Sequence, residues 1–137
     1  MKSNLIVMSA AVVLCAAAPV MAHHSFAAEF DGSRSIRVEG TLKKVDWSNP
    51  HSFFYVEVKD DKGTTVVWGC EGANPGTLSR RGLSKGDAKI GDHIVVDGYP
   101  AKDGSALMDA HRIYLNNKVI FGSAPMPGET PEGDGYK

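Results

Sequence analysis

Between residues 35 and 121, apolar and polar residues alternate in short runs, a pattern typical of β-strands that pack one face on a core. In the first run, the apolar positions change parity between Leu42 and Val45, and Gly40 lies inside the run. Both features predict a β-bulge and strong coiling of this strand. Strands are predicted over residues 35–47, 51–59, 64–71, 93–100 and 105–115, with a last short strand over residues 118–121.

A short helix is predicted between the third and fourth strands. Asn74 is a good N-cap, Pro75 suits the first helical position, and Gly82 can end the helix. Five strands with a helix in this place follow the order of an OB-type barrel, in which a bulged first strand curls round both sheets. We therefore predict an all-β fold, a small OB-like five-stranded barrel with one short helix between strands 3 and 4. A small β-sandwich is the alternative that periodicity leaves open.

The chain begins with a segment that has the pattern of an export signal. Lys2 forms a short basic region, residues 5–18 are apolar but too few to span a bilayer comfortably, and small residues precede a cut after Ala22. We expect a signal peptide over residues 1–22 and a periplasmic or secreted protein, with no membrane contact after cleavage. The OB-like domain is expected over residues 23–122. Residues 123–137 are rich in Pro, Gly and Glu and are predicted to be a flexible tail.

The predicted cut makes His23 the first residue of the mature chain, with an imidazole and a free α-amine on one residue. His24 follows at once, and His51 opens the second predicted strand. Copper(II) favours nitrogen donors of this kind. We therefore predict a copper site made by His23, His24 and His51, with Glu71 as a fourth ligand or as a partner that orients a histidine. The alternative is that the two leading histidines are a polar arm, that His51 caps a turn, and that Glu71 is a solvated strand end.

Composition limits the other functions that the chain can have. Its 15 basic and 16 acidic residues give a formal net charge of −1 and no basic patch, so nucleic-acid binding is not expected. No catalytic motif is present, and we do not read the chain as an enzyme. Trp47, Phe53 and Tyr55 are candidates for binding a small ligand or an unknown protein partner without a metal. Cys70 is the single cysteine left after signal removal, and we expect a buried, inert thiol.

Four segments of the chain resemble a bacterial family of small exported proteins, catalogued as domain of unknown function 6152. They are HHSFAAEFD (23–31), EGTLKKVDWSNPHSFFYVEVKD (39–60), RRG (80–82) and GDHIVVDGYPAKDGS (91–105). The resemblance implies export and a compact β fold, and it implies no activity. An acidic residue commonly follows the third strand's tryptophan segment in that family, and Glu71 fits this place. Cys70 and His111 do not belong to the family pattern, so any role for them would be particular to this chain.

Overall fold

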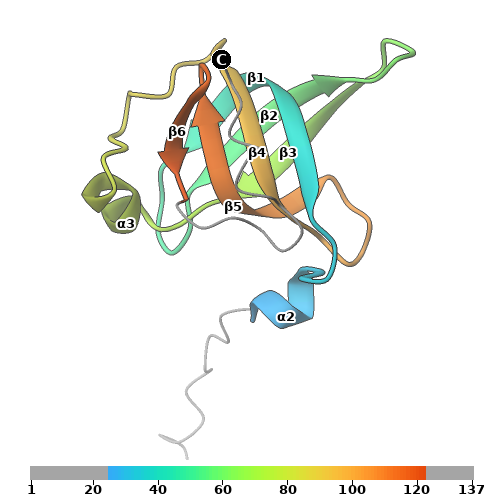
Figure 1. The fold of residues 1–137 in the computed structure, drawn as a ribbon, viewed down its shortest axis with the longest axis horizontal. Helices are drawn as coiled ribbons and strands as arrows, with labels where there is room; N and C mark the ends of the chain where they lie inside the picture. Colours follow the sequence, from blue (N-terminus) through green and yellow to red (C-terminus); the bar gives the residue numbers. More distant parts are fainter. Residues whose placement is uncertain (1–24, 123–137) are drawn as a thin grey trace, which may run out of the picture.

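A computed structural model describes residues 25–122 of the chain (Figure 1). The predicted export signal, His23, His24 and the predicted tail lie outside this range. Strands lie at all six predicted places, and a short helix lies between the third and fourth of them. The elements in order are α2 (Phe26–Glu29), β1 (Ile36–Asp46), β2 (Phe53–Lys59), β3 (Thr65–Glu71), α3 (Pro75–Arg80), β4 (His93–Pro100), β5 (Leu107–Leu115) and β6 (Lys118–Phe121).

The strands form one sheet that closes on itself. Its order is β3-β2-β1-β4-β5-β6, and β3 also pairs in parallel with β5, with Gly69, Cys70 and Glu71 opposite Leu107, Met108 and Asp109. This last pairing closes a five-stranded barrel, to which β6 adds an extra strand. The OB-like prediction is therefore confirmed, and the β-sandwich alternative is not adopted. Within residues 25–122, neither helix has the length or the apolar character to cross a membrane.

Strand β1 curls so that it can pair with β2 and β4 at once. Its register with β2 shifts between Leu42 and Lys44, which is the irregularity predicted from the change of parity. Gly40 lies where the strand passes closest to β2. A Cβ added there would overlap the carbonyl group of Glu57 and would lie 3.1 Å from Cγ1 of Val56. The absence of a side chain at Gly40 is therefore what permits this close approach.

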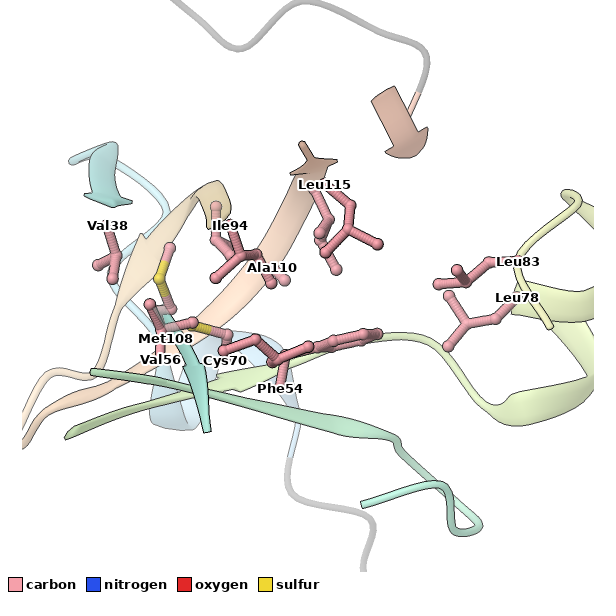
Figure 2. Close-up of a cluster of buried hydrophobic side chains, with 13 residues drawn as sticks. Val38, Phe54, Val56, Cys70, Leu78, Leu83, Ile94, Met108, Ala110 and Leu115 are labelled. Carbon is pink, nitrogen blue, oxygen red and sulfur yellow. The ribbon is translucent and has the colours of Figure 1, made fainter. Parts of the chain in front are cut away.

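The barrel interior is filled by one cluster of buried apolar side chains (Figure 2). Phe54 and Cys70 lie opposite each other on β2 and β3, and both are fully buried. Leu78 of α3 and Leu83 just after it extend the cluster towards the ring of Phe54. Burial raises the pKa of the Cys70 thiol to about 12, so the thiolate is disfavoured, as expected for an inert cysteine.

Helix α3 begins at the residue that the sequence indicated. The side chain of Asn74 accepts a hydrogen bond from the backbone N–H of Thr77 at 2.9 Å, and Pro75 occupies the first helical position. This cap stabilises the first turn of the helix, and Leu78 in that helix packs in the core with its side chain fully buried.

Substitution of Gly40 by alanine tests the close approach of β1 to β2. We expect Gly40→Ala to lower the free energy of unfolding by about 1–3 kcal/mol, because the added methyl group must displace backbone. Gly76→Ala is the control, since its new Cβ would lie no closer than 3.4 Å to its neighbours. Urea unfolding of both variants measures the difference, and equal stability of the two would contradict this account.

Candidate functional site

His51 and Glu71 meet at one end of the barrel, where β2 begins and β3 ends. Glu71 lies opposite Phe53 in the β2–β3 ladder, and its Oε1 is 3.1 Å from Nδ1 of His51. Beyond the strand ends, Ser52 donates to the carbonyl of Ala73 and accepts from the N–H of Gly72. These backbone bonds continue the ladder and hold the segment with His51 beside the segment that follows Glu71. The structure therefore brings together two of the four residues predicted to bind a metal.

The same end of the barrel holds a second carboxylate. Closure of the barrel places Asp109 of β5 directly opposite Glu71 of β3. Burial is the main cause that raises the pKa of both carboxyl groups above its usual range. The charge of His51 opposes the increase at both groups and His111 opposes it at Asp109, whereas Glu29 and Asp109 reinforce it at Glu71. The site is thus a partly buried pair of carboxyl groups with a histidine beside it.

The N-terminal arm is attached beside this cluster. The N–H of Asp31 donates to the carbonyl of Pro100, and the N–H of Lys102 donates to the carbonyl of Glu29, each at 2.9 Å. Helix α2 is thereby fixed at the end of β4 (Figure 1). The ring of Phe26 contacts the ring of Tyr99 edge-on, with centroids 5.5 Å apart. The chain that directly follows His24 therefore reaches the end of the barrel that carries Glu71 and Asp109.

Asp109 and His111 were not in the predicted metal set, although both lie at this end of the barrel. The ring of His111 lies against that of Tyr99, with centroids 6.1 Å apart. The only sequence signal was the Asp-x-His spacing, which is common by chance. The place of Asp109 beside Glu71 depends on the β3–β5 pairing, which joins distant parts of the chain and leaves no local pattern.

A complete metal site is not present within residues 25–122. No three His, Cys, Asp or Glu side chains of that range are arranged so that they can hold a metal ion. His51 and Glu71 would need further donors, and the predicted donors His23 and His24 lie outside the described residues.

Phe53 and Tyr55 form a pair on the outer face of β2. Their rings stack with centroids 6.2 Å apart at an interplanar angle of 25°, and Nζ of Lys44 lies 5.1 Å from the centre of the Tyr55 ring. Gly69 lies opposite Tyr55 on β3 and adds no side chain beside it. Trp47, the third aromatic residue predicted to bind a ligand, packs against the core cluster. The structure thus places an aromatic pair next to the His51–Glu71 pair.

A second histidine–glutamate pair lies elsewhere on the barrel. Nε2 of His93 on β4 is 3.0 Å from Oε1 of Glu39 on β1. The side chains of His51 and His93 are similarly exposed, at 45% and 43%. Glu39 is 56% exposed whereas Glu71 is 15% exposed, so the two pairs differ chiefly in the burial of the carboxylate.

The raised pKa of Asp109 predicts a pH-dependent effect on stability. Because the folded protein holds this proton more tightly than the unfolded chain, Asp109 contributes stability in acid that is lost as the pH rises through its folded pKa. We expect Asp109→Asn to raise the Tm at neutral pH and to have little effect below about pH 4, near the unfolded value. Thermal melts across pH, in the presence of a chelator, measure this.

Asp103→Asn is the control for that experiment. Hydrogen bonds from Ser105 lower the pKa of Asp103, which is the opposite direction. This substitution should therefore not raise the Tm at neutral pH. A fall in Tm for Asp109→Asn at neutral pH would show that the Asp109 carboxylate is stabilised by its surroundings, contrary to our account.

Comparison with known proteins gives a family of unknown function and a distant structural likeness. No curated protein matches the chain. A chain in the crystal structure of yeast Stn1 and Ten1 is similar to it, with 18% identity and a TM-score of 0.41, over 59% of this chain and 42% of that chain. This chain thus spans less than half of that one, and a likeness of this degree carries no argument about function.

The family comparison agrees with the resemblance seen in the sequence. The model of a family of unknown function, DUF6152, matches residues 10–109, which is most of the chain. The protein therefore belongs to the DUF6152 family.

Proposed function

We propose that this protein is an exported binding or accessory protein that holds one copper ion at the end of its barrel. The α-amine and imidazole of His23 and the imidazole of His51 would be the main ligands, with His24 assisting. The observation that carries the proposal is the His51–Glu71 contact at 3.1 Å, at the end of the barrel where the N-terminal arm is attached.

The contact favours a particular role for Glu71. Its carboxylate faces Nδ1 of His51, so a metal would bind the other ring nitrogen, Nε2. Carboxylates commonly orient metal-binding histidines in this way, and they raise the basicity of the ring. The exposed fractions fit this division, because the histidine is accessible at 45% whereas the carboxylate is shielded at 15%. We therefore assign Glu71 to orienting His51 and not to binding the metal directly.

The buried carboxyl groups and the length of the N-terminal segment support His23 and His24 as the remaining ligands. Burial disfavours the ionised forms of Glu71 and Asp109, and a bound cation would offset this cost. The three residues from His23 to Ser25 can span about 10 Å when extended. Because α2 is attached beside the cluster, the proposal requires only these three residues to bring the N-terminal nitrogen atoms to it. An amine and imidazoles are the donors that Cu(II) prefers, which is why we name copper.

Native mass spectrometry of the protein recovered after export tests the proposal. We expect a chain that begins at His23 and retains one copper after addition of one equivalent of Cu(II). His51→Ala should abolish retention, and Glu71→Gln should weaken binding by about 10–100-fold. His93→Ala is the matched control and should retain copper. A chain that begins beyond His24, or equal retention by the His51 and His93 variants, would contradict the copper site.

The second candidate function is a metal-free binding module for a small ligand or a protein. The stacked Phe53–Tyr55 pair favours it, because paired, partly accessible aromatic rings with a nearby lysine can bind planar or polar ligands. If this function is correct, chemical-shift mapping by NMR with a panel of soluble sugars and peptides should show changes at Phe53 and Tyr55. Alanine at either position should remove them, whereas His51→Ala should leave them intact. Shifts confined to the His51 end would count against this candidate.

A further inference from the structure

The outer half of β3 has one edge that no strand of residues 25–122 covers. β3 pairs with β2 along its whole length, from Thr65 to Glu71, but it pairs with β5 only from Gly69 onwards. Figure 1 shows the β2–β3 hairpin extending away from the barrel beyond this closure. Within residues 25–122, the stretch from Thr65 to Trp68 therefore pairs on one side only.

The hydrogen-bond pattern identifies which backbone groups face the open edge. The carbonyl of Thr64 accepts from Asp60 on the β2 side, whereas the N–H of Gly69 donates to the carbonyl of Ala106 on the opposite side. In an antiparallel ladder, successive residues turn their N–H and C=O groups to opposite edges. Thr65 and Val67 share the parity of Gly69, so both present a donor and an acceptor at the open edge.

This edge lacks the features that normally prevent strand pairing. Thr65, Val66, Val67 and Trp68 include no charge and no proline, and the register with β2 runs without a bulge. Val66 and Val67 are both exposed, at 41% and 47%. Val66 and Val67 point to opposite faces of β3, so each face of this strand carries an accessible, β-branched apolar side chain, which favours addition of another strand.

We propose that two copies of the chain associate through antiparallel pairing of their β3 strands, centred on Val66. In this register, Thr65 lies opposite Val67 of the partner subunit, and the same pair recurs across the two-fold axis. The two pairs form four hydrogen bonds between the outward backbone groups. Val66 then faces Val66 of the partner subunit in the non-hydrogen-bonded position.

A second copy is the occupant that this edge fits best, because the segment is complementary to itself. The outward groups of Thr65 and Val67 are separated by one residue, so a two-fold axis at Val66 satisfies all of them. The uncharged stretch brings no like charges together at the axis. This inference is independent of the proposed copper site, since no metal ligand takes part.

Sedimentation velocity across a concentration series, with the full chain, tests the association. We expect a concentration-dependent dimer that Val67→Lys removes, because a charge at this edge opposes pairing. Val119→Lys on β6 is the matched control, since Val119 is 44% exposed and also lies on an outer strand. A wild-type protein that stays monomeric throughout, or a dimer that only Val119→Lys removes, would overturn the proposal.

A cysteine at the axis tests the register. Opposed residues in a non-hydrogen-bonded pair have Cα atoms about 4.5 Å apart, within the range that a disulfide bridges. In a Cys15→Ser background, with Cys70 buried, Val66→Cys should form a disulfide-linked dimer under mild oxidation. Thr65→Cys is the control and should not, because it lies opposite Val67 of the partner subunit. Equal cross-linking by both variants would overturn the proposed register.

Discussion

The parallel pairing of β3 with β5 is the constraint on which the rest of the structure depends. It spans only three residue pairs, yet it turns an open antiparallel sheet into a barrel with a closed interior. Gly69 takes part in this pairing, and a Cβ at that position would lie 3.3 Å from the side chain of Leu107. A small residue here lets β5 come close, while Cys70 and Met108 in the next pair turn inward and are fully buried.

The same pairing creates the electrostatic character of the candidate site. It places Glu71 and Asp109 side by side where burial disfavours both charges. His51 offsets part of this cost of burying negative charge, because the residues just before β2 are held beside the end of β3. The copper ion that we propose would offset the remaining cost of burying these negative charges. The attached N-terminal arm adds the negative charge of Glu29, which raises the pKa of Glu71 further.

Closure is also the reason why part of β3 has an edge that the rest of residues 25–122 leaves uncovered. Since β5 covers only its last three residues, the rest of β3 extends into solvent as part of the hairpin with β2. A longer β3–β5 ladder would hide Thr65 and Val67. The pairing that brings Glu71 at one end of β3 beside Asp109 therefore leaves the other end of β3 with backbone groups available for a further strand.

The sequence alone determined the local structure. Alternation located the strands, the cap at Asn74 located α3, and the change of parity after Leu42 located the bulge in β1, because each depends on residues a few positions apart. It also named His51 and Glu71 among the four candidate residues of one metal site.

Only the tertiary structure decided which distant residues meet. Asp109 lies beside Glu71, Trp47 packs on the core, and α2 lies at the end of β4, as a result of barrel closure and the contacts of the N-terminal arm. Periodicity reports which face a residue occupies on its own strand. It carries no information about which strand will lie opposite, since that depends on how the whole chain closes round a single core.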